Sequence, residues 1–229
     1  MLMPCARASR QGGESLISLM VGLVLSMVVA LAMLSMFKVS ARYGGQAGQD
    51  AAADAQLAAA LLRAGLAVQD AGYGIASASL DTQLVVLSGA ALNGSVLSGS
   101  TVSAGSSGNA VLWAMNTTET SGSENCAGLL FLNSSGGSGG LYYLGPVACS
   151  GGSVSGWASL GWSSTRWADR PANQDAAAYD QTAMSFSVAS TSCKPFGVTS
   201  RSGAVAFTIA STNRSGAAVQ DKHCLFNFK

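Results

Sequence analysis

The sequence predicts an α+β protein in which a long N-terminal helix packs on an antiparallel, β-rich C-terminal domain. The first observation is an uncharged apolar run at residues 15–37, which helix-forming residues extend to about residue 71. The second is the loss of the helical period after about residue 76, where short apolar runs recur between Gly- and Ser-rich turns. A chain of 229 residues has room for one domain of ordinary size and one membrane segment.

The apolar run is long enough to cross a membrane. It reads SLISLMVGLVLSMVVALAMLSMF from Ser15 to Phe37, and Lys38 and Arg42 follow it. A helix rises about 1.5 Å per residue, and the hydrocarbon core of a bilayer is about 30 Å thick. An ordinary secretory signal has a shorter apolar core and a small-residue cleavage site after it. The sequence therefore predicts a transmembrane and assembly helix over residues 14–38.

The helix is expected to continue through residues 39–75 as an amphipathic segment. Gly44, Gly45 and Gly48 mark a weak point in it, because glycine lowers helix stability. Beyond them, one face carries apolar residues that two further leucines flank: Leu57, Leu61 and Val68, with Leu62 and Leu66. Glycines at positions 72 and 74 supply the C-terminal stop. The alternative is a plain membrane anchor followed by a linker helix.

Residues 76–229 are expected to form the β-rich domain. Short apolar runs occur at Gln83–Leu87, Ala110–Met115, Gly128–Leu132, Leu141–Leu144, Met184–Ala189, Ala204–Ala210 and Cys224–Phe228. Met184–Ala189 and Ala204–Ala210 alternate with period two, which is typical of strands that pack one face on a core. An antiparallel sheet that rests on the amphipathic helix would bury the apolar faces of both.

The cysteine pattern is typical of an exported domain with two disulfides. Cys5 lies in the N-terminal segment, and the other cysteines lie in the C-terminal two thirds of the chain: Cys126, Cys149, Cys193 and Cys224. An even number of cysteines in an exported domain indicates two disulfides, which form in an oxidising compartment. A zinc site is the disfavoured rival, because no CxxC pair occurs and His223 is the sole histidine.

The spacing of the cysteines favours one pairing. Cys126 and Cys149 lie almost symmetrically outside the two apolar runs that flank the Gly/Ser loop at residues 133–140, so antiparallel pairing would bring them opposite each other. Cys193–Cys224 then follows by elimination, although four cysteines allow three pairings. A simple three-strand meander would place Cys193 and Cys224 at opposite ends of the sheet. We therefore expect a loop that turns back rather than neighbouring hairpins.

Composition and motifs argue against an enzyme and against a nucleic-acid-binding protein. Charged residues make up 10% of the chain, the net charge is +1, and Lys and Arg form no basic face. No phosphate-binding loop, dinucleotide-binding glycine motif, zinc-protease motif or serine-hydrolase motif occurs. We therefore expect no catalytic residue, no metal and no cofactor. A hydrolase on a membrane stalk would need a cluster of titratable groups, which the sequence does not show.

Two weaker patterns concern ligands. Oxygen-bearing side chains occur together without EF-hand spacing, which favours a solvated loop over a calcium site: Asp169, Asn173, Asp175 and Asp180. Trp157, Trp162 and Trp167 recur among Gly and Ser. They are expected to be buried anchors rather than exposed adhesive aromatics. His223 is expected to lie at the surface.

A short basic leader precedes the apolar run. Residues 1–13 carry Arg7 and Arg10, contain no acidic residue and end in a glycine pair. The stretch GESLISLMV, which begins at Gly13, resembles the cleavage site of the type IV prepilin family. In that family a dedicated peptidase cuts after glycine on the cytoplasmic side. The resemblance implies that Gly13 precedes the cut and that Glu14 is the first mature residue.

The helix beyond the cut resembles that of PilW-like minor pilins. The sequences LMVGLVLSMVVALAMLSMF and AALLRAGLAVQDAGYGI carry this resemblance, which covers roughly residues 10–75. It implies a pilin-like fold whose helix also assembles a filament, through residues that open the helix: Leu16, Ile17, Ser18, Leu19 and Gly22. Gly22 would permit close approach of a neighbouring helix. The second expected bridge is similar to the C-terminal disulfide-bounded loop of many pilins.

Two residues depart from the family pattern. Glu14 replaces the usual aromatic first residue, and Ser18 replaces the glutamate usual at the fifth mature position. In the family that carboxylate is thought to pair with the N-terminal amine of a neighbouring subunit, which Ser18 cannot do. One explanation is a subunit at the filament tip. The others are that Glu14 neutralises an amine, or that the chain is a diverged family member.

The resemblance implies a minor subunit of a type IV pilus, with the tip as one position. Such a subunit supports pilus assembly and adhesion, twitching motility or DNA uptake. Its implied partners are other major and minor pilins, the prepilin peptidase and the inner-membrane assembly platform. It implies a location in the inner membrane of a Gram-negative bacterium, then in a periplasm-spanning, extracellular pilus. The rivals are a pseudopilin of a type II secretion system and a membrane-anchored periplasmic binding or adhesin domain that never polymerises.

Overall fold

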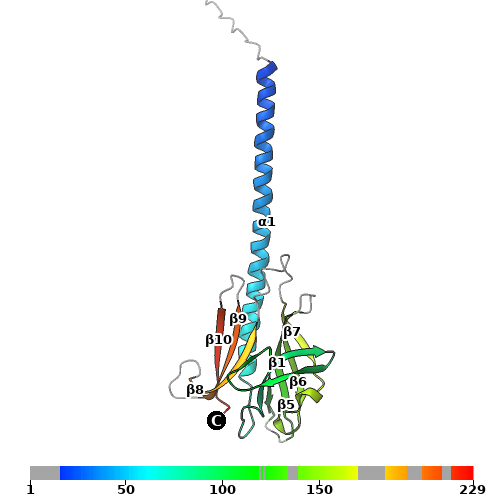
Figure 1. Cartoon of the computed structure of the whole chain (residues 1–229), viewed down its shortest axis with the longest axis vertical. Coiled ribbons are helices and arrows are strands. Elements are labelled where there is room, and N and C mark those ends of the chain that lie inside the picture. Colours follow the sequence, from blue (N-terminus) through cyan, green and yellow to red (C-terminus); the bar gives the residue numbers. More distant parts are fainter. Residues whose placement is uncertain are drawn as a thin grey trace, which may run out of the picture. The chain divides into compact units, whose positions relative to one another are not determined.

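The chain divides into two compact units, Met1–Ala52 and Ala53–Lys229. The computed structural model describes residues 16–118, 120, 122–133, 139–169, 184–194, 203–212 and 218–228. Helix α1 (Leu16–Val68) contributes residues to both units (Figure 1). The basic leader lies outside the described residues, and the expected segment boundaries after residues 13, 38 and 75 stay predictions.

Helix α1 is uninterrupted at its glycines. Its 53 residues are rich in Ala, Leu and Met, which are strong helix formers. The expected weak point at Gly44, Gly45 and Gly48 remains helical. After Val68 the chain enters turns, where Gly72 has a φ of 74° that glycine adopts without strain. The helix therefore ends close to the stop that its glycines predict.

Six of the described strands form one antiparallel sheet in the order β2-β1-β4-β5-β6-β7. They are β1 (Leu84–Asn93), β2 (Val96–Val102), β4 (Ala110–Met115), β5 (Asn125–Leu132), β6 (Gly140–Ala148) and β7 (Ser164–Asp169). Sequence analysis missed β2 and β7. Both are short on apolar residues and rich in Ser, Thr or charged residues.

A second antiparallel sheet has the order β10-β9-β8-β3 among the described residues. Its strands are β3 (Ser107–Gly108), β8 (Ser185–Cys193), β9 (Gly203–Thr212) and β10 (Ala218–Leu225). The expected last strand at Cys224–Phe228 is wrong in its bounds, because the strand begins at Ala218. The α+β class with a long N-terminal helix and an antiparallel β domain is confirmed.

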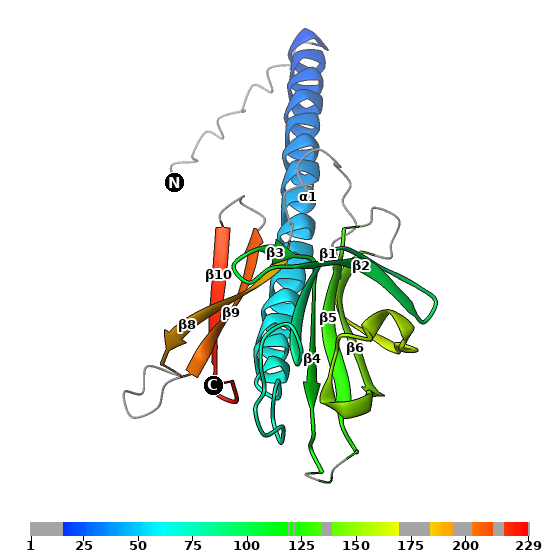
Figure 2. The same cartoon turned by 60° about the horizontal axis from the view of Figure 1, so that its bottom comes forward.

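The main core lies between the two sheets, where the last part of α1 is inserted (Figures 1 and 2). Ala60, Ala64 and Val68 of α1 are 1%, 0% and 0% exposed, and large side chains of both sheets surround them. The expected helix face is confirmed, because Val68 is buried and Leu57 and Leu61 are partly buried against this core. Sequence analysis did not single out the more deeply buried Ala60 and Ala64, and the flanking Leu62 and Leu66 face outward with 65% and 62% exposure.

A second cluster covers the opposite face of the six-stranded sheet. Two short 3-10 helices, η1 (Ser150–Gly152) and η2 (Trp157–Ser159), precede β7. Next to them Trp162 is 2% exposed, and its indole N–H donates to the carbonyl of Trp157 over 2.9 Å. On the main-core side, Trp167 stacks on Tyr143 with ring centroids 4.8 Å apart. The tryptophans are anchors of the fold, as expected.

Two disulfides are present, with the pairings that the sequence favours. Cys126 and Cys149 are joined with a Cα–Cα distance of 5.6 Å, and Cys193 and Cys224 are joined at the same distance. The first bridge links β5 to the residue just after β6, and both its cysteines are buried in the second cluster. Each bridge is expected to stabilise the fold by about 2–4 kcal/mol.

The second bridge corrects the expected topology. Strands β8, β9 and β10 are neighbouring hairpins, not a loop that turns back. In a meander the first and third strands run parallel, and Cys193 and Cys224 both lie near the carboxyl ends of their strands. A register irregularity between β8 and β9 lies between Ser190 and Cys193, just before the bridge. The missing side chain of Gly203 leaves room, because a Cβ there would lie 3.0 Å from the Cys224 sulfur.

His223 of β10 is largely covered, which corrects the expected surface position. Its side chain is 18% exposed and stacks against Phe207 at a centroid distance of 6.2 Å. The imidazole lies directly against Gly65 of α1, where a methyl group would overlap the ring. Gly65 therefore allows β10 to approach the helix closely.

Replacing Gly74 by Ala should destabilise the protein strongly. Gly74 and Gly89 have φ values of 68° and 60°, which cost an alanine about 1–2 kcal/mol at either site. At Gly74 the new methyl group would also overlap the carbonyl oxygen of Asn116, whereas at Gly89 it meets no atom within 4 Å. We expect Gly74→Ala to lower the free energy of unfolding by about 1–3 kcal/mol more than Gly89→Ala, measured by urea unfolding in detergent. Equal losses would contradict this packing.

Candidate membrane and assembly surface

The first part of α1 has the length and composition of a membrane span. Leu16–Gly48 comprises 33 residues; its most apolar 18-residue window has a mean hydropathy of 2.6, and no part of that window is buried within the chain. At about 1.5 Å per residue this segment exceeds the thickness of a hydrocarbon core. Its backbone polar groups are hydrogen-bonded within the helix, which a bilayer requires.

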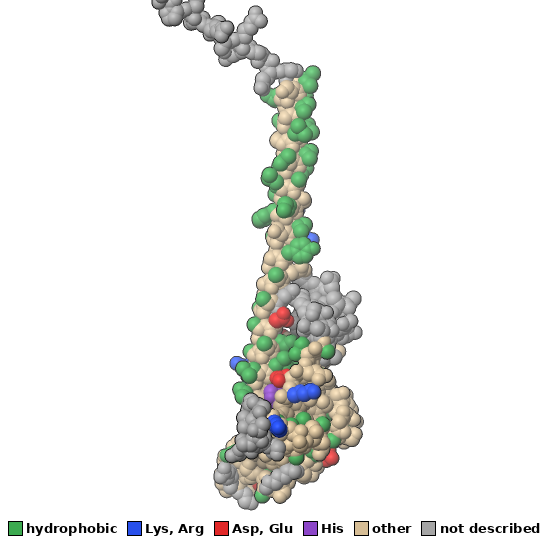
Figure 3. Space-filling model, turned by 90° about the vertical axis from the view of Figure 1, so that its left-hand side faces the viewer, with side chains coloured by type: hydrophobic (Ala, Val, Ile, Leu, Met, Phe, Trp, Pro, Cys, Tyr) green, Lys and Arg blue, Asp and Glu red, His purple; other side chains and the backbone are tan. Residues whose placement is uncertain are grey.

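Apolar side chains surround this segment on all sides. The large apolar residues between Leu16 and Val39 are each 52–76% exposed. Figure 3 shows them along the helix on the face in view, with few charged groups among them. A helix that is apolar all round needs either lipid or other apolar helices around it. The segment can anchor the chain in a membrane.

Small residues form a strip along this helix. Ser18, Gly22, Ser26 and Ala30 recur every four residues and therefore lie on one side. The Ser26 hydroxyl donates to the carbonyl of Leu23 over 2.8 Å, which satisfies its donor without an outside partner. A Cβ on Gly22 would meet no atom within 4 Å, so the strip is open. Such strips let two helix backbones approach closely in membranes.

The sequence-predicted site residues fall into two groups. Those that open the helix are described and exposed: Leu16, Ile17, Ser18, Leu19 and Gly22. The cleavage residues Gly13 and Glu14 lie outside the described residues. Their predicted roles in processing and assembly stay predictions.

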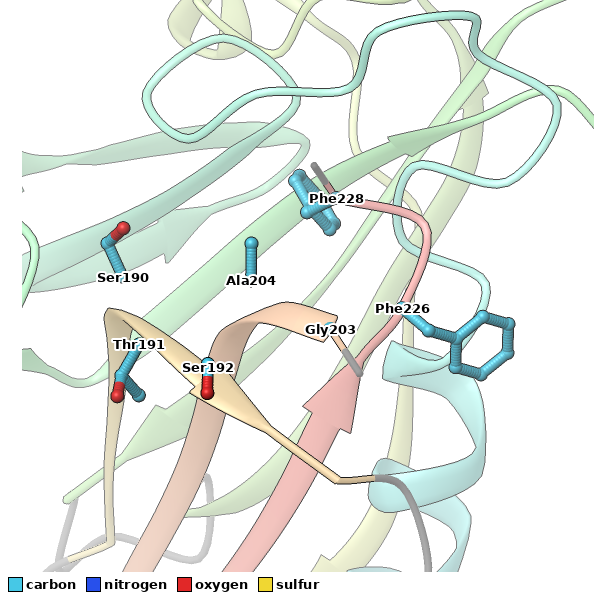
Figure 4. A pocket seen from close by; sticks show the side chains of 7 residues that line it. All are labelled: Ser190, Thr191, Ser192, Gly203, Ala204, Phe226 and Phe228. Atoms are coloured by element: carbon cyan, nitrogen blue, oxygen red, sulfur yellow. The ribbon is translucent and has the colours of Figure 1, made fainter. Parts of the chain in front are cut away.

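An open hollow of about 590 Å³ lies at one end of the second sheet (Figure 4). It is lined by Ser190, Thr191, Ser192, Gly203, Ala204, Phe226 and Phe228. Figure 4 shows Phe226 pointing away from the side chains of β8. None of these lining residues is ionisable, so they offer no acid, base or metal ligand. Sequence reasoning missed the hollow because its residues come from three separate segments.

An ion pair on β7 is hydrogen-bonded to a tyrosine of β6. Arg166 lies 2.6 Å from a carboxylate oxygen of Asp169 and donates to the Tyr142 hydroxyl over 2.9 Å. The hydrogen bond from Arg166 lowers the pKa of the Asp169 carboxyl. Asp169 is thus engaged by a cation, and the other residues of the calcium hypothesis lie outside the described residues: Asn173, Asp175 and Asp180.

Among the described residues, His223 and Asp221 form a second close pair of ionisable side chains. His223 Nε2 lies 3.0 Å from a carboxylate oxygen of Asp221, but the alignment is not that of a hydrogen bond. Gly65 of α1 lies against the ring, as described above, so the ring packs into the fold rather than facing an open site. Among the described residues, no group of three or more His, Cys, Asp or Glu side chains is arranged to hold a metal ion.

No model of a protein family, no curated protein and no solved structure matches the chain. The long apolar helix, the antiparallel β domain and the two disulfides are consistent with a pilin-like architecture.

Placing two charges in the middle of the apolar segment should release the protein from membranes. Leu25→Arg with Val29→Arg places two cations where each costs about 2.5–3.5 kcal/mol on insertion. Leu62→Arg with Leu66→Arg is the matched control, because this pair has the same spacing and similar exposure but lies outside the span. We expect only the first pair to move the protein into the fraction extracted by alkaline carbonate. The same distribution for both pairs would contradict a membrane role for the segment.

Proposed function

We propose that the chain is a minor subunit of a type IV pilus, located at or near the filament tip. In this role it supports pilus assembly and adhesion, twitching motility or DNA uptake. The observation that carries the proposal is the helix at Leu16–Gly48, which is apolar on all sides and continues as α1 into the β domain. A basic leader that ends in Gly13 precedes it.

The apolar helix supports assembly because one surface serves two environments. In the inner membrane, lipid surrounds its side chains. In a filament, apolar helices of other pilins replace the lipid, so extraction exposes little apolar surface to water. The strip that contains Ser18, Gly22 and Ser26 offers a place where a neighbouring helix packs closely.

Ser18 supports a terminal position. A mature N-terminal amine buried among apolar helices requires a nearby negative charge, because an unpaired buried charge is costly. Ser18 supplies no such charge to a neighbour, so this subunit is suited to an end of the filament where no further amine must be neutralised. The prepilin peptidase and the inner-membrane assembly platform would act on the leader and on the membrane-held helix.

The β domain supports a location outside the cytoplasm. Both disulfides belong to this domain, and such bridges persist in oxidising compartments. We therefore propose that the domain faces the periplasm and then the exterior.

The mature protein is expected to begin at Glu14. Mass spectrometry of the N-terminus, after isolation from the native membrane or from sheared filaments, measures this directly. Gly13→Leu should block the cut and leave Arg7 and Arg10 on the chain, whereas Gly12→Leu is the matched control and should still be processed.

The outcome also separates the rivals. A mature chain that begins at Glu14 retains the filament systems, and neighbouring pilus or secretin-linked secretion genes then distinguish a pilus from a type II secretion pseudopilin. A chain with an intact leader, or one that begins beyond Phe37, would sink the filament proposal and favour an anchored binding or adhesin domain.

Ser18→Glu should reduce incorporation into filaments if the subunit sits at the tip. The new carboxylate would be buried without a partner amine, at a cost of several kcal/mol. Ser18→Gln is the control, because it has the same size without the charge. The amount of protein in the sheared filament fraction, divided by the membrane amount, provides the measurement. Equal or better incorporation of Ser18→Glu would contradict the tip position.

A further inference from the structure

Strand β2 is an edge strand without a charged side chain. Of the described strands of six residues or more that end a sheet, β7 carries Arg166 and Asp169, and β10 carries Asp221 and Lys222. Charges on an edge strand hinder pairing with another chain. β2 has the sequence VLSGSTV, and residues 82–118 around it contain no Asp, Glu, Lys or Arg. This edge therefore lacks protective charges, although the segment after η2 reaches the turn before β2, where the Trp162 backbone N–H donates to the Ser95 carbonyl over 2.9 Å.

The main chain of β2 is arranged to accept another strand. A two-residue turn joins β1 to β2, with Asn93 paired to Val96 and a φ of 62° at Gly94. Because an antiparallel ladder alternates, the peptide groups of Leu97, Gly99 and Thr101 point away from β1. Among the described residues β2 pairs with β1 alone, and Figure 2 shows the β1–β2 hairpin at the rim of its sheet.

The register irregularity in the β1–β2 hairpin adds no residue to β2. Between the pairs Ser88–Ser100 and Ala91–Ser98, β1 advances three residues while β2 advances two. The extra residue belongs to β1, so the bulge does not interrupt β2. All seven residues of β2 remain in a continuous strand.

We propose that β2 is a self-association edge, at which two copies of the chain pair their β2 strands antiparallel about a two-fold axis at Gly99. This register places Leu97 opposite Thr101 of the second copy and Gly99 opposite its own equivalent. The paired residues are those whose peptide groups point outward, so each facing pair exchanges two hydrogen bonds. The axis lies at the centre of β2, and the pairing therefore uses its whole length.

The side chains of β2 suit this register. Val96 is 56% exposed and would lie opposite Val102, which already packs against the main core. Such β-branched pairs stabilise adjacent strands, and Ser98 opposite Ser100 introduces neither bulk nor charge. A second copy is the favoured partner because a two-fold axis at Gly99 pairs valine with valine and serine with serine along the strand. The inference does not depend on the proposed pilus function.

Engineered cysteines test both the pairing and its register. The full chain in detergent, with Cys5→Ser, is prepared with either Ser98→Cys or Ser100→Cys. In the proposed register these residues form a facing, non-hydrogen-bonded pair, whose Cα atoms lie about 4.5 Å apart, within disulfide range. After mild oxidation, a mixture of the two variants should give at least about five-fold more covalent dimer than either variant alone, since like residues lie diagonally.

Two controls make the result decisive. Thr101→Lys adds a charge at the edge and should abolish the cross-link, while circular dichroism reports whether the fold is retained. Gln220→Cys on the charged edge β10 gives the background of random collision. A cross-link no stronger than this background, or one that survives Thr101→Lys, would overturn the proposal. The second result would assign the contact to the apolar helix.

Discussion

The C-terminal unit depends on the insertion of a narrow helix face between two sheets. Ala60, Ala64 and Val68 fill this space, and the absence of a side chain at Gly65 admits the imidazole of His223. Larger residues on this face would push the sheets apart and expose the apolar side chains that both direct inward. Small residues at these positions therefore determine whether two sheets share one core or form two thinner ones.

The same helix obeys a different constraint in its first part. There no apolar side chain is covered by the chain itself, and hydrophobicity is spread around the axis. A helix surrounded by lipid alone must be apolar on all sides, whereas one that supports a sheet needs only one apolar face. The change from one pattern to the other occurs within one continuous helix.

The fold class was predictable because a long uncharged apolar run, followed by the loss of the helical period, is a strong signal. Individual strands and buried positions were harder to predict. Hydrophobicity placed Leu57, Leu61 and Val68 on the core-facing side of the helix, but it did not indicate that Ala60 and Ala64 are also deeply buried there. The first part of strand β10 escaped detection because an edge strand with one solvated face reads as polar, AVQDKHCL. β2 escaped because Ser, Gly and Thr make up most of its sequence, VLSGSTV. The hollow near Phe226 arises only when distant segments meet, which no local pattern records.

The bridge between Cys193 and Cys224 ties the outer strands of the meander across β9. A chain held where thiols stay reduced lacks this tie, and its second sheet depends on backbone pairing and the shared core alone. If the domain faces the periplasm, as proposed, it acquires its full rigidity only after it leaves the compartment where it is made, so that maturation is coupled to transport. Oxidation would then act as a checkpoint that separates newly made chains from mature ones.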